Sequence, residues 1–205
     1  MAKTRRRFKY TSDGQPLMYI SHQKHDGLIK RAIKGLVKSN YKPDLIIFIA
    51  TGGLYVGSVL KRVLDIPYAI WRAQGYENKS GNQYDTASRR IVFSRHIVFI
   101  SPDGKKTELT KKLFAKFQNI LVVDDLDDSG RTFHKALCLL REHFGDKFQI
   151  RTLCLWHKTC STFMVDYIAE AVGVDPKSGK YPWIVQPYED WADRIKGFLE
   201  RKKKK

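Results

Sequence analysis

Residues 120–132 read Ile-Leu-Val-Val-Asp-Asp-Leu-Asp-Asp-Ser-Gly-Arg-Thr, and this stretch decides the expected fold. Its first four residues are apolar and mostly β-branched, which is the pattern of a strand buried on both faces. Beyond the acidic turn, apolar residues recur at the spacing of one helical face: Phe133, Ala136, Leu137, Leu140 and Phe144. The stretch therefore predicts a buried strand, an acidic turn and an amphipathic helix.

The turn between this strand and this helix combines features that point to one kind of ligand. Four carboxylates occupy the five positions from Asp124 to Asp128. The helix that follows begins with free N–H groups, and the Ser129 and Thr132 hydroxyls and the close backbone approach at Gly130 complete a phosphate cradle. A phosphorylated ribose suits both halves, because it brings a phosphate and vicinal hydroxyls. The alternative is a metal-holding or phospho-accepting turn, as in receiver domains, which explains only the acids.

The segment Val122–Thr132 resembles the phosphoribosyl-pyrophosphate (PRPP) signature of type I phosphoribosyltransferases. The resemblance implies an α/β fold, with a mainly parallel twisted sheet flanked by helices and a small C-terminal hood. It makes Asp128 the candidate general acid or base at purine N7. The residues implied to hold the ribose and 5′-phosphate of PRPP are Asp124, Asp125, Asp128, Ser129, Gly130, Arg131 and Thr132. Mg²⁺ is the expected cofactor, with Asp124 and Asp125 as ligands, because it prefers carboxylate, hydroxyl and phosphate oxygens.

A second strand, turn and helix lie earlier in the chain. Residues 45–50 are all apolar, and Thr51, Gly52 and Gly53 lead directly into a helical pattern over residues 54–64. A Gly-Gly pair alone is as often a simple tight turn. In the resembled xanthine–guanine phosphoribosyltransferase branch, such a turn binds the pyrophosphate of PRPP and often follows an arginine. Thr51 offers one hydrogen bond in place of a charged fork, so we add Arg72 to the expected pyrophosphate group.

The purine side of the expected site comes from the last third of the chain. A strand pattern over residues 149–156 ends in His157 and Lys158. A lysine there is most often solvated, but the resemblance makes Lys158 the donor to the 6-oxygen of a purine and His157 only a neighbour. Residues 181–191 are dense in aromatic side chains and include two prolines. They suit a packed cap, or, within the resemblance, the hood that places Trp183 and Ile184 against the purine ring.

The remaining patterns complete one α/β domain over residues 1–205. They predict helices over residues 24–38, near 109–117 and over 192–205, and strands over residues 67–71, 91–93, 97–100 and 166–171. Residues 72–88 are rich in glycine and asparagine and predict a long loop. In the resembled family that loop closes over PRPP during turnover, which would exclude water from the reacting centre.

Composition limits the class of protein. The chain has 205 residues, of which 42% are hydrophobic, enough for one full core. No apolar run approaches the roughly 18 residues of a spanning helix, and the basic N-terminus lacks an apolar signal core, so we expect a cytoplasmic protein. Cys138, Cys154 and Cys160 show no paired ligand spacing and are expected to be free thiols.

The formal net charge of +17 is concentrated at the two ends of the chain. Five positive charges lie in residues 1–9 and five more in residues 201–205, with no acid in either, which leaves +7 for the rest. Solvated mobile tails are one interpretation. Non-specific attraction to nucleic acid or another anionic surface is the other.

These predictions combine into one expected activity. The chain would be an enzyme that transfers the 5-phosphoribosyl group of PRPP to N9 of a 6-oxopurine (guanine, xanthine or hypoxanthine). The products would be a purine nucleoside 5′-monophosphate and pyrophosphate, as in purine salvage, and the resemblance implies a homo-oligomer, a dimer or tetramer. One alternative is a PRPP-sensing regulator that binds nucleic acid through its basic surface, although no helix-turn-helix is apparent. The other is a transferase for a different nucleobase.

Overall fold

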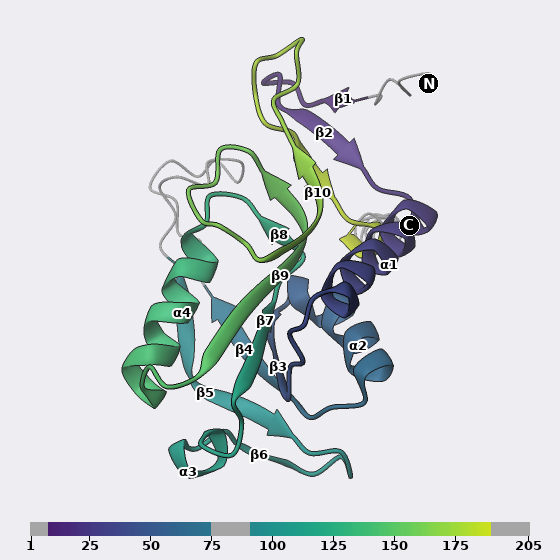
Figure 1. Cartoon of the computed structure of the whole chain (residues 1–205). Helices are drawn as coiled ribbons and strands as arrows, with labels where there is room; N and C mark the ends of the chain where they lie inside the picture. Colours follow the sequence, from purple (N-terminus) through teal and green to yellow (C-terminus); the bar gives the residue numbers. More distant parts are fainter. Residues whose placement is uncertain (1–7, 75–90, 190–205) are drawn as a thin grey trace, which may run out of the picture. The chain divides into compact units, whose positions relative to one another are not determined.

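The computed structural model describes residues 8–74 and 91–189 (Figure 1). Its helices are α1 (His22–Lys38), α2 (Gly52–Leu64), α3 (Lys111–Phe114) and α4 (Arg131–Phe144). Its strands are β1 (Lys9–Tyr10), β2 (Pro16–Tyr19), β3 (Leu45–Ala50), β4 (Tyr68–Gln74), β5 (Val92–Ile100), β6 (Lys106–Glu108), β7 (Asn119–Val123), β8 (Leu126–Asp127), β9 (Gln149–Lys158), β10 (Tyr167–Val172) and β11 (Trp183–Val185).

The chain forms two compact units whose boundary falls within α1. The larger unit comprises residues 29–172, and the smaller comprises residues 1–28 and 173–205. The predicted fold class is confirmed in the larger unit, where strands alternate with helices around a mainly parallel sheet. Among the described residues, no helix is both long and apolar enough to cross a lipid bilayer.

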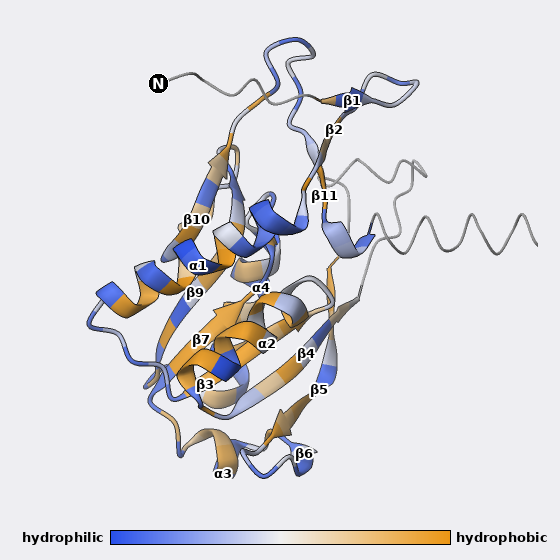
Figure 2. Ribbon diagram, turned by 90° about the vertical axis from the view of Figure 1, so that its right-hand side faces the viewer, coloured by the Kyte–Doolittle hydropathy of each residue, from blue (hydrophilic) through white to orange (hydrophobic). Residues whose placement is uncertain are grey.

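The carboxyl ends of the parallel strands all lie along the same side of the large sheet, which we call its carboxyl edge. Its strand order is β10-β9-β7-β3-β4-β5-β6, and β8 pairs with β9 beside that path. The strands from β10 to β4 run parallel, whereas β5 and β6 are antiparallel to their neighbours. α2 and α4 cover opposite faces of this sheet (Figures 1 and 2). In such sheets, ligands bind beyond the carboxyl ends of the strands.

Continuous apolar runs explain why β3 and β7 lie at the centre. Every residue of β3 is buried, as are the last four of β7, and both strands are strongly hydrophobic in Figure 2. α4 turns Phe133, Ala136 and Leu140 into the core, as its periodicity predicts. Phe144, near the end of α4, stacks on Phe114 with ring centroids 4.0 Å apart. Packing of this core therefore fixes where β3 and β7 end relative to each other.

The smaller unit contains the predicted hood, but its sheet draws on both ends of the described chain. β2 pairs antiparallel with β1 and parallel with β11. The Tyr10 hydroxyl donates to Asp175 at 2.9 Å, and the Gln15 amide donates to the Tyr181 carbonyl at 2.8 Å. The sequence did not indicate β1 or β2, because such short strands carry too few residues for a period-2 pattern. Lys9, assigned from sequence to a mobile tail, lies in β1.

Three other predicted boundaries differ from the structure. The strands predicted over 91–93 and 97–100 are one strand, β5, which begins at Val92 and pairs with β4 on both sides of a register shift between Trp71 and Ala73. The helix expected near residues 109–117 is only the four-residue α3, capped by the Thr110 hydroxyl. Residues 72–74 of the predicted loop extend β4, and most of that loop and the helix expected over 192–205 lie outside the described residues.

Candidate active site

Two turns meet at the carboxyl edge because β3 and β7 are parallel neighbours. Phe48 lies opposite Val123 in the register, so the turn after β3 faces the turn that begins at Asp124. A Cβ atom on Gly52 would overlap the Asp125 carboxylate, and one on Gly53 would overlap the Val123 carbonyl. Only glycine leaves room for this approach. The glycine pair therefore makes space for the acidic turn as well as offering backbone N–H groups at the start of α2.

Asp124 and Asp125 form a crowded pair of carboxylates at the tip of β7. Asp124 is 8% exposed, and its Oδ1 accepts a hydrogen bond from the Asp125 amide at 2.9 Å. Burial, and secondly the charge of Asp125, raise the pKa of Asp124 well above its ordinary value. A cation or a set of hydroxyl donors at this point would relieve the repulsion. The two carboxylates, Asp124 and Asp125, are therefore oxygen ligands of the kind that fits the expected Mg²⁺.

The number of carboxylates bears on which kind of metal ion would fit this point. In residues 8–74 and 91–189, no cluster of three or more His, Cys, Asp or Glu side chains is suited to holding a metal ion. Mg²⁺ is commonly bound through one or two protein carboxylates, with substrate phosphates and water completing its shell. The site thus suits a metal that arrives with a polyphosphate ligand better than a metal held by the protein alone.

The predicted phosphate cradle lies between the acidic turn and α4. Gly130 precedes the first residue of α4 and has φ of +83°, a conformation that glycine adopts without strain. A Cβ atom there would lie 2.8 Å from the Phe163 backbone nitrogen. The first N–H groups of a helix have no partner within the helix and suit an anion. Ser129 and Thr132 are half-buried and Arg131 is exposed around this point.

Asp128 and Lys158, predicted for different tasks, form an ion pair. Lys158 Nζ lies 2.6 Å from Asp128 Oδ1, and the two side chains are 6% and 22% exposed. Lys158 ends β9, whose pairing with β7 and β8 brings it to the acidic turn. The site therefore holds an ammonium donor next to a carboxylate acceptor.

A second acid–base pair, which the sequence did not indicate, lies beside the first. Asp127 Oδ2 lies 2.8 Å from His157 Nδ1, and the Asp127 side chain is only 2% exposed. Asp127 belongs to β8 and lies opposite His157 in β9. A two-residue strand inside a turn has no sequence signature. The only available signal was that Asp-Asp and His-Lys each follow a buried strand.

The remaining predicted pyrophosphate residues lie on adjoining strands. Arg72 pairs in register with Ala50, the residue before Thr51, and its side chain is exposed. Thr51 is also exposed and does not use its hydroxyl to cap α2. The pairing of β3 with β4 therefore brings Arg72 next to the Gly-Gly turn. A residue that takes the place of the arginine often found before this turn has to lie at such a position.

Trp183 and Ile184, predicted to contact the purine ring, belong to the smaller unit. Both lie in β11, where Trp183 is half-buried and Ile184 is buried. They pair in register with Leu17 and Met18 of β2. Their contact with a base stays a prediction.

Comparison with known proteins bears directly on this arrangement. A family model described as "Phosphoribosyl transferase domain" matches residues 19–190. The chain belongs to this family. The match spans both turns of the carboxyl edge, Lys158 and β11, so all the predicted site residues lie within it.

Individual relatives fit the same family. Xanthine phosphoribosyltransferase 1 of Saccharomyces cerevisiae is 24% identical over 140 residues, which is 65% of this chain, and the chain spans 64% of the length of that relative. A purine phosphoribosyltransferase from Pyrococcus horikoshii is similar in structure, with 26% identity, a TM-score of 0.58, and coverage of 83% of this chain and 92% of its own. A xanthine-guanine-hypoxanthine phosphoribosyltransferase from Helicobacter pylori has the same fold at 16% identity, with a TM-score of 0.59 and coverage of 87% and 97%.

These findings confirm the resemblance to type I phosphoribosyltransferases near the 6-oxopurine branch. They also support the expectation that the chain is a purine phosphoribosyltransferase. The roles of individual residues, the cofactor and the preferred base stay predictions.

Proposed function

We propose that this chain transfers the 5-phosphoribosyl group of PRPP to N9 of a 6-oxopurine, producing a purine nucleoside 5′-monophosphate and pyrophosphate. The family supports phosphoribosyl transfer. One observation supports the class of base: the ion pair between Lys158 and Asp128, with Nζ and Oδ1 2.6 Å apart. An ammonium group donates hydrogen bonds and accepts none, whereas an ionised carboxylate only accepts.

This donor and acceptor suit one edge of a 6-oxopurine. The 6-oxygen accepts from Lys158, and a protonated N7 donates to Asp128. A 6-amino group in place of the oxygen presents N–H donors to the ammonium, so two donors face each other and no hydrogen bond forms between them. Facing two buried donors is costly, so such a site discriminates strongly against an amino group.

The other residues bind different parts of the PRPP molecule. The Asp124 and Asp125 carboxylates accept hydrogen bonds from the ribose hydroxyls, and the backbone from Asp128 to Thr132 holds the 5′-phosphate. Thr51, Gly52, Gly53 and Arg72 hold the pyrophosphate. Bound at Asp124 and Asp125, Mg²⁺ would neutralise the negative charge of the leaving group. As the base adds, Asp128 takes the proton at N7, and an oxocarbenium-like state forms at the anomeric carbon.

The direct test is a pyrophosphate-release assay with PRPP, Mg²⁺ and a panel of free bases. Guanine, xanthine and hypoxanthine should support release, whereas adenine and orotate should not. Release with none of the five bases would refute the proposal. Release that is confined to adenine or orotate would refute the 6-oxopurine assignment alone.

A matched pair of lysine variants tests the role of Lys158. Lys158→Met should lower kcat/KM for 6-oxopurines by about 100-fold or more, because the donor to the 6-oxygen is lost. Lys105→Met is the control, since Lys105 forms an exposed ion pair with Asp103 at 3.0 Å. Unchanged use of 6-oxopurines by Lys158→Met would point to a transferase for a different nucleobase.

The regulator hypothesis is a further outcome of these assays. Residues 1–7 and 190–205, which contain most of the basic tails, lie outside the described residues. Salt-sensitive nucleic-acid binding that disappears when both tails are removed, together with no base-dependent pyrophosphate release, would favour it. Mg²⁺ dependence, homo-oligomerisation and a cytoplasmic location belong to the proposal as predictions, each open to direct measurement.

A further inference from the structure

The geometry points to His157 as a positioning residue that acts through Asp127 to hold Asp128 opposite Lys158. This inference rests on the proposed function of that site and assigns a role to a residue for which the sequence indicated none. It starts from a difference in how firmly the two halves of the Lys158–Asp128 pair are held.

The Lys158 half is anchored by β10 and by the turn that follows β9. Lys158 lies opposite Val172 in the parallel pairing of β9 with β10. Its carbonyl accepts a hydrogen bond from the Ser161 amide at 2.9 Å, and the next amide, that of Thr159, donates to the Val172 carbonyl at 3.0 Å. The backbone that carries the ammonium group is therefore set by the main sheet.

The Asp128 half lies in a turn with fewer backbone anchors. The Asp125 carbonyl accepts from the amides of Leu155 and Trp156, at 3.1 and 3.0 Å, and β8 then follows β9 for only two residues. Asp128 itself lies beyond β8. Its carbonyl accepts a hydrogen bond from Cys160 Sγ at 3.5 Å, and a thiol is a weak donor. A stronger anchor is needed to hold this carboxylate to within a few tenths of an ångström.

The Asp127–His157 contact supplies that anchor. It joins the last residue of β8 to its register partner in β9, at 2.8 Å and with side chains that are 2% and 17% exposed. Because an ionised carboxylate can only accept, Nδ1–H of His157 is assigned as the donor. A buried carboxylate that lost this donor would have to move toward water. Any such movement of Asp127 carries the adjacent Asp128 with it.

The arrangement keeps the anchor away from the reacting groups. Successive side chains of a strand leave opposite faces, so His157 and Lys158 point to different sides of β9. His157 can therefore fix Asp127 without competing for the face on which Lys158 and Asp128 meet. Catalytic groups depend on such supporting hydrogen bonds, and an error of about 1 Å in placement costs about 100-fold in rate.

Three variants test the inference. His157→Leu removes the donor, whereas His157→Asn retains an N–H group near the position of Nδ1 without an imidazole. The matched control is His96→Leu, because His96 Nδ1 also lies 2.8 Å from a carboxylate, that of Glu108, but in a pair that is 75% and 55% exposed. Melting temperatures are measured for all three, so that a folding defect is recognised.

Two readouts are taken on the full-length protein. The first is steady-state pyrophosphate release, in which His157→Leu should lower kcat about tenfold while leaving the KM for PRPP within twofold. The second is the rate at which trinitrobenzenesulfonate modifies Lys158, followed by peptide mass spectrometry. That rate should rise severalfold in His157→Leu, because the carboxylate that covers the amine is loosened. His157→Asn should recover most of both effects, and His96→Leu should show neither.

The outcomes separate this inference from the proposed function. If the wild-type protein releases no pyrophosphate with any base, the proposed function fails, and lysine modification alone decides the positioning role. If His157→Leu matches His96→Leu in both readouts, the inference is overturned. It is also overturned if kcat falls while the KM for PRPP rises in proportion and His157→Asn gives no recovery, since that pattern describes general loosening of the turn.

Discussion

The carboxyl edge of the large sheet and the β5–β6 hairpin contain the same kinds of residue pair, buried in one region and exposed to solvent in the other. Each has a His–carboxylate contact with 2.8 Å between Nδ1 and oxygen. Each has an Asp–Lys pair, at 2.6 Å on the edge and 3.0 Å in the hairpin. Each has a glycine with φ of +83°, Gly130 on the edge and Gly104 in the hairpin. The pairs on the edge are mostly buried, and those in the hairpin are exposed.

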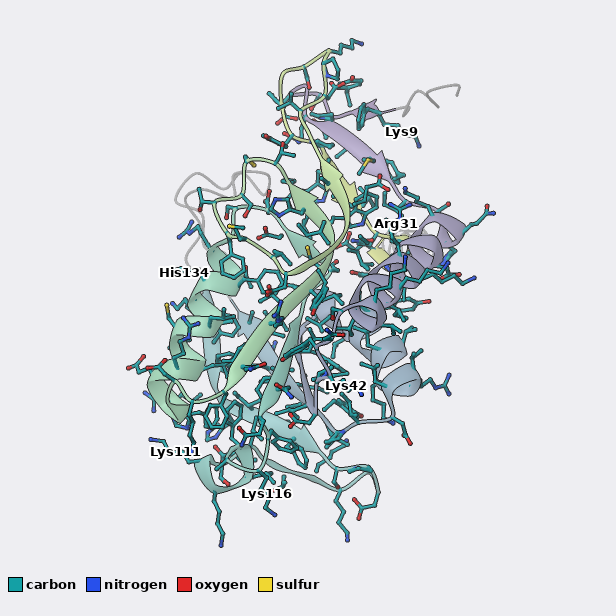
Figure 3. All side chains as sticks on the ribbon, in the orientation of Figure 1. Lys9, Arg31, Lys42, Lys111, Lys116 and His134 are labelled. Carbon is teal, nitrogen blue, oxygen red and sulfur yellow. The ribbon has the colours of Figure 1, made fainter. Side chains whose placement is uncertain are left out.

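Burial changes what these contacts do. An exposed ion pair contributes about 0–1 kcal/mol, because water solvates each partner well. A buried pair gains little net stability but costs much when one partner is removed. Lys111 and Lys116 around α3 show how a charged side chain reaches water directly, because both are exposed and extend into solvent (Figure 3). The edge therefore keeps charges that stability alone does not require, which is the expected mark of a functional site.

The largest expected difference between the two regions is in catalysis. Asp128→Asn should lower kcat by about 10²- to 10⁴-fold, because the amide cannot take a proton from the base. The KM for PRPP should change little, since in the proposed site the backbone, and not this side chain, holds the 5′-phosphate. Asp103→Asn, which alters the exposed Asp–Lys pair, should leave both values unchanged. Pyrophosphate release under saturating PRPP measures the effect, and wild-type turnover in Asp128→Asn would remove the catalytic role.

The next difference concerns the two glycines. Both substitutions to alanine force a side chain into a left-handed conformation, which costs about 1 kcal/mol. A Cβ atom on Gly104 meets nothing within 4 Å, whereas one on Gly130 meets the Phe163 backbone nitrogen at 2.8 Å. Gly130→Ala should therefore lower the free energy of unfolding by about 3 kcal/mol, and Gly104→Ala by about 1 kcal/mol. Chemical denaturation checks both, and equal losses would show that the turn adapts freely.

A smaller difference is expected for the acids that face the two histidines. Asp127→Ala should destabilise the fold by about 2 kcal/mol, because it leaves the largely buried His157 ring without its acceptor. Glu108→Ala should cost less than about 0.5 kcal/mol, since both members of that pair are exposed. Denaturant midpoints measured in parallel test the contrast. A cost for Glu108→Ala as large as that for Asp127→Ala would contradict it.

The smallest effect should appear at Asp124, as a change in pH dependence. Its pKa is raised above the ordinary 3.8, so the folded state holds the proton more tightly than the unfolded chain. The free energy of unfolding should then fall as pH rises from about 4 through the folded-state pKa. Asp103 should act in the opposite sense, since the Ser101 hydroxyl lowers its pKa and its contribution is lost on acidification.

The variant Asp124→Asn tests this assignment, because asparagine keeps the shape and the acceptor for the Asp125 amide. In a chelating buffer, its melting temperature should exceed that of the wild type at pH 8 and equal it at pH 4. PRPP binding should weaken at the same time, which is the usual cost of removing an unfavourable charge from a functional site. A melting temperature below that of the wild type at pH 8 would show that the ionised carboxylate stabilises the fold.

Sequence patterns were sufficient for the central strands β3 and β7, for the helices α2 and α4, and for the turns that join them. The apolar runs at residues 45–50 and 120–123 and the period of residues 133–144 are strong local signals, since burial on both faces leaves no polar position in a strand. The tips of these strands carry the acidic turn and the Gly-Gly turn, and the parallel register places the two turns side by side. Short strands such as β2 and β8 were missed, because two to four residues define no period.

By itself, the amino-acid sequence determined the family, the parallel sheet and the group of residues at its carboxyl edge, because these depend on hydrophobic period and on a long local motif. Only the tertiary structure decided which acid faces which base. The pairing of Asp128 with Lys158 and of Asp127 with His157 depends on the register between β8 and β9, which are separated by residues 128–148, a connection that includes α4. The same fold also decided that these pairs are buried while their counterparts in the hairpin are exposed, and burial is what makes the loss of one partner costly.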